Sequence, residues 1–218
     1  MARWDKYWGD EAYVARNWIE PDPDIIRLIP IMRGHHAQRV LDLGCGVGRH
    51  LWYLGQEGFE VHGLDISPIG VERCRKELEQ RRLSAVVQVA DMHHIPYPDA
   101  YFDWALSVQV IHHSTVATLK EAIQHVRGKL RPGGFFYVTF PPVDTIGPDS
   151  GQEVEPRTYL KEEDGEPLLH HYVTAEEIDE LLAGFTLVEK RLDPREVRDQ
   201  VGNVTRRFRW NVLGQSVS

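Results

Sequence analysis

Residues 40–50, VLDLGCGVGRH, constrain the fold of this chain more than any other stretch. An apolar run that contains Asp42 is followed by Gly44, Gly46 and Gly48, and a helix-compatible segment comes next. This order indicates a buried strand, a turn without side chains and a helix, because glycine allows a sharp turn and close approach of a ligand. In an open parallel sheet such a turn lies at the carboxyl end of a strand, where ligands bind.

The same alternation of β-rich and helical patterns continues along the chain. Strands are predicted at 39–44, 59–67, 84–91, from 102 onward and at 135–140, with helices at 48–58, 67–82, 118–130 and 174–185. Two closing strands are predicted at 185–193 and 206–215. Ser67 and Thr174 are the expected N-caps of two helices, with Glu177 completing a capping box. The pattern predicts an α/β fold with a parallel sheet covered on both faces, as one domain over residues 1–218.

Two segments fall outside this alternation. In residues 1–34 aromatic side chains recur every three to four positions, which indicates a helical face that either packs on the core or closes as a lid. We expect Trp4, Tyr7 and Trp8 to reach the acceptor site, where aromatic walls could hold a cation. Residues 142–172 are acidic and rich in Pro and Gly, which is typical of a lid or a disordered surface loop. This second lid would bring His170 and His171 to the mouth of the pocket, although a solvated segment before the next helix is the alternative.

Composition limits the partners and the compartment. The net charge of −8 disfavours sequence-independent nucleic-acid binding, which needs a basic face. Cys45 and Cys74 form no CxxC motif, so we expect a reducing cytoplasm rather than a disulfide scaffold. No signal peptide is visible, and no apolar run approaches the roughly 18 residues of a membrane span.

Acidic residues at the strand ends distinguish two kinds of ligand. A dinucleotide fingerprint would read GxGxxG, whereas this turn reads GxGxG. Asp42 would repel a pyrophosphate but suits an ammonium or sulfonium group. Asp65 after the second strand could accept hydrogen bonds from two ribose hydroxyls, and Asp91 after the third could accept from an adenine amino group. These features describe a nucleoside with a cationic far end, such as S-adenosylmethionine.

At this point the chain resembles a known family, the class I S-adenosylmethionine-dependent methyltransferases of the type 11/25 kind. Four motifs in order carry the resemblance: VLDLGCGVGRH, VHGLDIS, VADMHHIPYPDAYFDWALSVQVIHH and LRPGGFFYVTF. They span residues 39–140. The resemblance implies a Rossmann-like, doubly wound sheet of seven strands in the order 3-2-1-4-5-7-6. Strand 7 would be antiparallel, within a three-layer α/β/α sandwich.

The resemblance also implies a map of the cofactor site. Residues 42–48 would line the methionine part, residues 65–66 the ribose, residues 91–92 the adenine and residues 107–109 the sulfonium. The residues implied are Asp42, Gly44, Cys45, Gly46, Gly48, Asp65, Ile66, Asp91, Met92, Ser107, Val108 and Gln109. Core packing is the alternative role for Ile66 and Met92. N-capping of the next segment is the alternative for Asp65 and Asp91.

Histidines are the candidates for proton transfer. A general base is needed only if the nucleophile arrives protonated. His112 and His113 follow the fourth strand, where acceptor and cofactor should meet, so they are the best candidates by position. Their alternative role is capping or packing under the cofactor. No HxxxH or Cys/His spacing supports a metal site, and none is predicted.

The leading functional hypothesis is methyl transfer from S-adenosylmethionine to O, N or S of a small molecule, leaving S-adenosylhomocysteine. A second hypothesis is a wobble-uridine type tRNA methyltransferase, with Arg206, Arg207 and Arg209 on phosphates. A third is a cofactor-binding regulatory module without catalysis. We expect a monomer or homodimer without membrane association.

Overall fold

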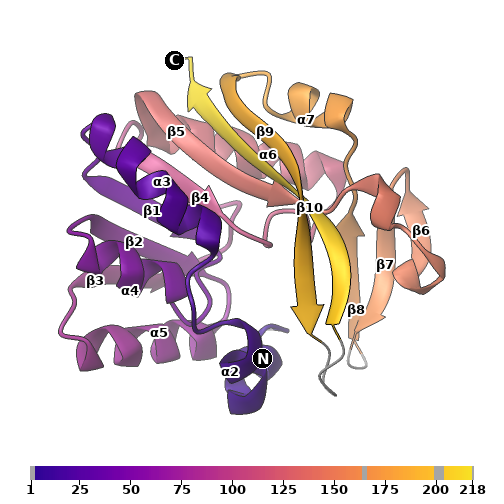
Figure 1. Cartoon of the computed structure of the whole chain (residues 1–218), viewed down its shortest axis with the longest axis horizontal. Coiled ribbons are helices and arrows are strands. Elements are labelled where there is room, and N and C mark those ends of the chain that lie inside the picture. The colour runs from indigo at the N-terminus through magenta and orange to yellow at the C-terminus, as the bar shows by residue number, and fades with distance from the viewer. Residues whose placement is uncertain (1–2, 164–165, 199–203, 218) are drawn as a thin grey trace.

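The computed structural model describes residues 3–163, 166–198 and 204–217, and is built around one large sheet (Figure 1). Its strand order is β3-β2-β1-β4-β5-β10-β9, with β10 antiparallel to both β5 and β9. The strands are β1 (Arg39–Leu43), β2 (Glu60–Asp65), β3 (Ala85–Val89), β4 (Phe102–Ser107), β5 (Leu130–Phe140), β9 (Phe185–Arg198) and β10 (Val204–Ser216). Counting only this sheet, the order is 3-2-1-4-5-7-6, so the predicted topology is confirmed.

Helices cover both faces of the sheet and give the predicted three layers. One core cluster joins the sheet to α3 (Pro23–Gly34), α4 (Arg49–Gln56) and α5 (Pro68–Gln80). The other joins it to α6 (Val116–Lys129) and α7 (Ala175–Leu181). The burial of Trp104 and Tyr137 toward the first cluster and of Phe136 toward the second shows that the strands present apolar side chains to both layers.

The N-terminal segment has two different parts. Ile25, Leu28 and Met32 of α3 are fully buried, so this helix belongs to the core. The aromatic residues precede it, on and around α1 (Asp5–Gly9) and α2 (Glu11–Asn17). α1 packs against α5 and α2 packs against α1, and residues of both helices line the cavity described below. The segment with α1 and α2, rather than the core-facing side of α3, is therefore placed near a site at the carboxyl edge of the sheet.

The helix caps follow the sequence with one exception. The Ser67 hydroxyl accepts from the Gly70 N–H, and the Thr174 hydroxyl accepts from the Glu177 N–H, as expected of N-caps. The predicted capping box at α7 is wrong about the Glu177 carboxylate, which instead pairs with Arg157 and with the imidazole of His171. An ion pair to a guanidinium outweighs a backbone hydrogen bond there.

Residues 142–172 form an ordered substructure that the sequence did not predict. Two 3₁₀ turns, Val143–Thr145 and Pro148–Ser150, lead into an antiparallel sheet of β6 (Gln152–Glu155), β7 (Thr158–Glu163) and β8 (Glu166–His171). This small sheet stands beside the β9–β10 hairpin (Figure 1). Because Trp210 pairs with Phe140 at the end of β5, the part of β10 before Trp210 extends past the main sheet. Among the described residues no helix is long and apolar enough to cross a membrane.

Candidate cofactor and acceptor site

A cavity of about 1510 Å³ opens at the carboxyl ends of the parallel strands. Its floor is formed by the segments that follow β1, β2, β3 and β4, and its walls come from α1, α2, β8 and β10. Ligand pockets usually measure about 300–1,000 Å³. The cavity therefore has room for two molecules side by side.

The glycine turn shapes the inner end of this cavity. Gly44 and Cys45 line it, as predicted. Gly46 has φ +53°, and a Cβ there would lie 2.7 Å from the ring of Trp8, which covers the turn. Gly46 is therefore not among the lining residues. Gly48 is not among them either, because its Cα faces the Sγ of Cys74 on α5.

Asp42 lies behind the cavity wall rather than on it. Its carboxylate is 1% exposed, and its Oδ2 is 3.3 Å from Nδ1 of His50. Asp42 is not among the residues that line the cavity, whereas His50 and Arg49 are, so its contact with a ligand stays a prediction. Arg49 was not predicted, although a cation directly after the glycine turn was visible in the sequence. Its guanidinium lies 4.5 Å from the Trp18 ring centroid, and burial lowers its pKa.

Asp65 is a buried acid at the end of β2 that lines the cavity. Its Oδ2 accepts from the Gly46 N–H at 2.8 Å and its Oδ1 from the Ser67 N–H at 2.9 Å. Burial raises the pKa of Asp65 to about 6. A carboxylate offers about four lone-pair sites, so two remain for hydroxyl groups of a ligand. The predicted contact with ribose hydroxyls and the alternative role as a cap of the following segment are therefore both compatible with this side chain.

The segment after β3 supplies a more exposed acid. The side chain of Asp91 is 47% exposed, and its Oδ1 accepts from the His93 N–H at 2.9 Å. Asp91 and Met92 both line the cavity, as does the half-exposed Ile66 across from them. The two loops after β2 and β3 therefore present two carboxylates and two apolar side chains to the same space.

The end of β4 contributes a strained turn. Val108 and Gln109 line the cavity, whereas Ser107 is fully buried and does not. Gln109 has φ +61°, which is costly for a residue with a side chain, and its N–H donates to the Thr139 hydroxyl at 2.8 Å. Strain of this kind is found at functional sites more often than elsewhere.

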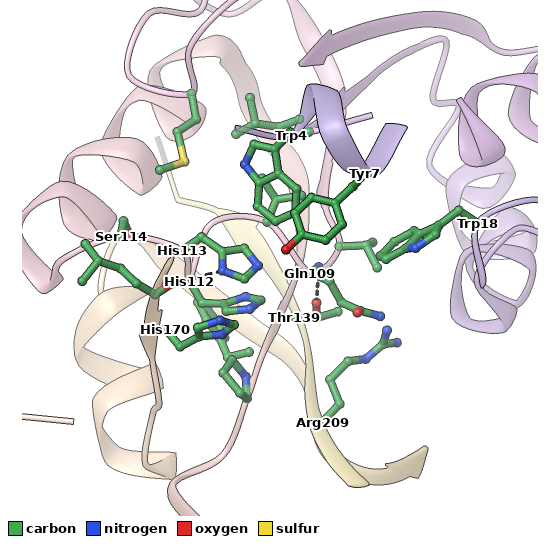
Figure 2. Close-up of a pocket in the computed structure, with 18 of the residues that line it drawn as sticks. Trp4, Tyr7, Trp18, Gln109, His112, His113, Ser114, Thr139, His170 and Arg209 are labelled. Atoms are coloured by element: carbon green, nitrogen blue, oxygen red, sulfur yellow. Dashed lines mark hydrogen bonds between the residues drawn. The ribbon is translucent and has the colours of Figure 1, made fainter. Parts of the chain in front are cut away.

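Three imidazoles gather at the outer end of the cavity. His112 and His113 follow β4, and His170 comes from β8 (Figure 2). The ring centroid of His113 lies 4.1 Å from that of His112 and 4.7 Å from that of His170. Burial, with a smaller contribution from His113, lowers the pKa of His112 well below its usual range, so this imidazole is neutral at pH 7.

Of the two histidines expected at the pocket mouth, His170 lines the cavity and His171 does not. His171 is fully buried, with Nδ1 2.8 Å from the Thr158 hydroxyl and Nε2 3.2 Å from Glu177. Successive side chains of a strand point to opposite faces, so His170 faces the cavity when His171 does not. The sequence showed the pair, but which member faces inward depends on the pairing of β8.

Aromatic side chains close the cavity from the N-terminal side. Trp4, Tyr7, Trp8, Tyr13 and Trp18 all line it and contact one another as rings. The Trp4 ring centroid lies 5.1 Å from that of His113, and Figure 2 shows Trp4 and Tyr7 next to the three imidazoles. The predicted positions of Trp4, Tyr7 and Trp8 at the pocket agree with this arrangement.

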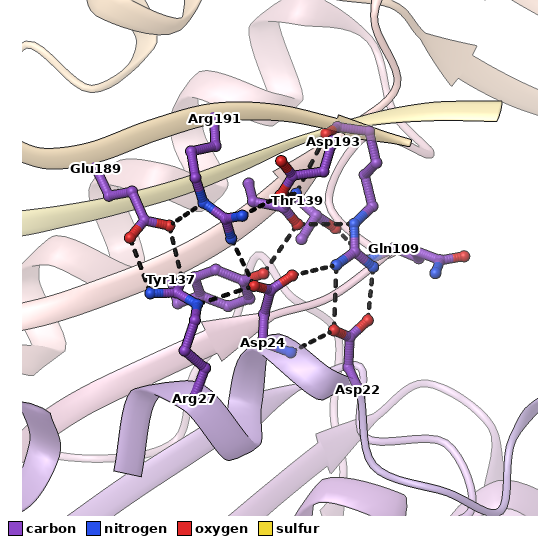
Figure 3. A network of polar contacts seen from close by, with 11 residues as sticks. Asp22, Asp24, Arg27, Gln109, Tyr137, Thr139, Glu189, Arg191 and Asp193 are labelled. Atoms are coloured by element: carbon purple, nitrogen blue, oxygen red, sulfur yellow. Dashed lines mark hydrogen bonds and ion pairs between the residues drawn. The ribbon is translucent and has the colours of Figure 1, made fainter. Parts of the chain in front are cut away.

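The arginines of β10 differ from each other in environment. Arg209 is 6% exposed and donates to both carboxylate oxygens of Asp22, at 2.7 and 3.2 Å. It belongs to a network with Asp24 that Arg27 and Arg191 extend (Figure 3). The suggestion that Arg209 contacts phosphates is therefore wrong, because its charge is already neutralised. Arg207 is exposed, and the side chain of Arg206 lies outside the described residues.

Comparison with known proteins gives one consistent answer. Residues 41–138 match the family model for the methyltransferase domain. Malonyl-[acyl-carrier protein] O-methyltransferase of Enterobacter lignolyticus is 33% identical over 67% of this chain and 53% of its own length. The tRNA (carboxymethyluridine(34)-5-O)-methyltransferase of Arabidopsis thaliana is 36% identical over 46% of this chain and 23% of its own. The chain spans about half the length, or less, of such curated relatives.

A solved structure shows the same fold with a ligand in place. This is the 1,6-didemethyltoxoflavin-N1-methyltransferase of Burkholderia thailandensis, bound to 1,6-didemethyltoxoflavin and S-adenosylhomocysteine. It superposes with a TM-score of 0.67 at 19% identity, over 96% of this chain and 83% of that one. Sheet order, motifs and family match place this chain among the class I S-adenosylmethionine-dependent methyltransferases. S-adenosylmethionine is accordingly its cofactor.

Proposed function

We propose that this protein transfers a methyl group from S-adenosylmethionine to an oxygen, nitrogen or sulfur atom of a small molecule. The size and lining of the cavity carry this proposal. Its inner end has the acids and the arginine that suit the cofactor, and about 1510 Å³ leaves a second compartment beyond them. That compartment is walled by indole, phenol and imidazole rings, which suit a compact organic acceptor rather than a long polymer.

The residues at the inner end fit the cofactor by their chemistry. The free lone pairs of Asp65 suit the two ribose hydroxyls, and the exposed Asp91 suits the adenine amino group. Met92 and Ile66 offer apolar surface to the two faces of the adenine. Arg49, half-buried beside the glycine turn, suits the carboxylate of the methionine part.

When bound, the cofactor supplies a methyl group on a sulfonium, which is already a good leaving group. The protein then has to align the acceptor and exclude water. Trp4 and Tyr7 cover the acceptor compartment, and Trp8 seals the glycine turn. These three side chains are therefore proposed to form the closed side of the reaction chamber.

His113 is the proposed base for an acceptor that arrives protonated. Its Nδ1 donates to the Leu169 carbonyl oxygen at 3.1 Å, so Nδ1 carries the proton and Nε2 is the nitrogen that would accept one. The neutral His112 beside it adds no positive charge that would lower the basicity of His113. An acceptor with an acidic nucleophile would not need this step.

The test is transfer of labelled methyl from S-adenosylmethionine into cell extract separated into small molecules and nucleic acid. Label in the small-molecule fraction is expected, and loss of that label in Asp65→Ala would tie it to this site. Asp99→Ala is the matched control, since Asp99 is an exposed acid that pairs with Lys129 at 2.6 Å and does not line the cavity. Cofactor binding without label in either fraction would contradict methyl transfer.

Methylation of tRNA is the second candidate function, because one relative is a tRNA methyltransferase. Exposed Arg207 at the cavity rim is the residue that supports it. Label in the RNA fraction would favour it, and its binding should weaken steeply as salt rises. We also keep a cytoplasmic location as a proposal, which two free, buried cysteines support.

A further inference from the structure

We propose that His112, His113 and His170 together bind a divalent transition-metal ion at the outer end of the cavity. One ring nitrogen of each imidazole lies within 4.8 Å of a ring nitrogen of the other two. The three residues are the lining histidines on one side of the pocket (Figure 2). Neither the family match nor the cofactor explains why three imidazoles should share this space.

The hydrogen bonds around the cluster orient the rings for such a role. Metal-binding histidines usually donate their second ring N–H to a carbonyl or carboxylate, which fixes the tautomer. His113 does this through Nδ1 to the Leu169 carbonyl oxygen at 3.1 Å, which makes Nε2 the nitrogen that would coordinate an ion. Leu169 immediately precedes His170 on β8, so the group that orients one ligand belongs to the strand that carries another.

His112 supplies the strongest single observation. Its side chain is 7% exposed, and within the described part of the chain its Nδ1 has no hydrogen-bond partner. Leaving a buried polar atom unsatisfied costs about 1–3 kcal/mol, so such atoms usually have a ligand or a role. Coordination to a metal ion would satisfy this atom.

The backbone holds the two supplying elements together. The His171 N–H donates to the His112 carbonyl oxygen at 2.9 Å, which joins β8 to the loop after β4. His171 is in turn fixed by Thr158 and Glu177. This arrangement gives His171 a positioning role and leaves its neighbour His170 pointing into the cavity.

The nature of the ligands indicates the kind of ion and its use. Imidazole suits zinc, copper, iron and nickel, and three protein ligands leave a fourth position open. Metal–nitrogen bonds of 2.0–2.1 Å in a tetrahedral site place the nitrogens about 3.3 Å apart, so nitrogens that lie within 4.8 Å of one another have to approach by at most about 1.5 Å on binding. Because all three histidines line the cavity, the open position would be accessible from it. Resting on the proposed function, we infer that it holds a lone-pair atom of the acceptor, with His113 then a ligand and not a base.

The experiment uses the full chain without a histidine tag, stripped with a chelator and titrated with Co²⁺ or Zn²⁺ alone. Calorimetry should show one ion per chain, and Co²⁺ should develop the visible absorption of a nitrogen-ligated tetrahedral site. His170→Gln and His113→Gln should each weaken binding by about tenfold or more. His125→Gln, at an exposed position on α6, should not change it.

Binding of S-adenosylmethionine by each variant reports that the fold is intact. Absence of saturable binding of either ion, or equal binding by wild type and His170→Gln, would overturn the proposal. Metal binding without methyl transfer would leave the site standing while the proposed function failed. If metal-free protein transfers the methyl group and added metal does not change the rate, the ion has no role in the reaction.

Discussion

Replacing Arg209 by methionine should expose how the β9–β10 hairpin is held to the core. The guanidinium is buried and donates to Asp22 at 2.7 and 3.2 Å, to Asp24 at 3.3 Å and to Asn211 at 2.9 Å. Methionine preserves most of the side-chain length without the charge. The substitution therefore removes the guanidinium hydrogen-bonded to Asp22, which is 3% exposed, and leaves only the longer-range attraction of Arg49 to that carboxylate.

The magnitude follows from what remains after the substitution. Asp24 keeps Arg27 and Arg191 as partners, so the cost falls mainly on Asp22. Removing one member of a buried ion pair costs about 3–5 kcal/mol, because the other charge stays buried and uncompensated. At about 2–4 °C per kcal/mol for a chain of this size, the melting temperature should fall by roughly 6–20 °C.

Thermal and urea unfolding of four proteins would test this reasoning. Adding Asp22→Asn to Arg209→Met should recover most of the lost stability, because asparagine removes the buried charge while still capping α3. Arg207→Met is the control at the exposed neighbouring position and should change the free energy of unfolding little. An Arg209→Met variant within about 1 kcal/mol of wild type, or a double variant no better than the single one, would refute the argument.

Three other outcomes are expected. The pKa of Asp65 is raised to about 6 in the folded protein, so between about pH 4 and pH 6 the folded state keeps a proton that the unfolded state has lost. The free energy of unfolding should therefore fall by up to about 3 kcal/mol as the pH rises through this range. Urea unfolding of Asp65→Asn should not show this pH-dependent loss. Gly46→Ala places a methyl group 2.7 Å from Trp8, so its destabilisation should shrink by at least about 0.5 kcal/mol in a Trp8→Ala background. Methylation of an uncharged small molecule should vary little between 50 and 200 mM salt, whereas RNA binding would fall by orders of magnitude across that range.

The inner half of the site could be predicted because each of its acids lies at the carboxyl end of a strand that the sequence pattern indicates. Asp65 and Asp91 each follow a strand, and parallel strands bring their carboxyl ends to one edge. The exact wall could not be predicted in the same way. Asp42 belongs to the same motif but lies behind His50, since the orientation of a strand side chain depends on the helices packed against it.

The outer half could not be predicted because its residues meet through pairing of distant segments. Whether His170 or His171 faces the cavity depends on the register of β7 with β8, two strands whose polar sequence carries no clear alternation. Arg209 was interpreted as a free cation because its partner Asp22 lies 187 positions away. A count of charges along a chain does not show which of them are already paired.

The same distant contacts indicate that substitutions can alter the acceptor end of the cavity without altering the cofactor end. Each segment that walls the acceptor compartment is joined to another by a few specific bonds: Arg3 to the carbonyl oxygen of Glu166 in β8, and Asp5 to the hydroxyl of Ser67 at the start of α5. Neither bond involves Gly44 or the other residues of the glycine turn after β1. A change in the N-terminal helices or in β6–β8 therefore alters the acceptor compartment and its cover without rebuilding the sheet, because the sheet and α3–α7 bury the main cores independently of those segments. Acceptor specificity in this protein should accordingly be altered most readily by substitutions at Trp4, Tyr7 and His170.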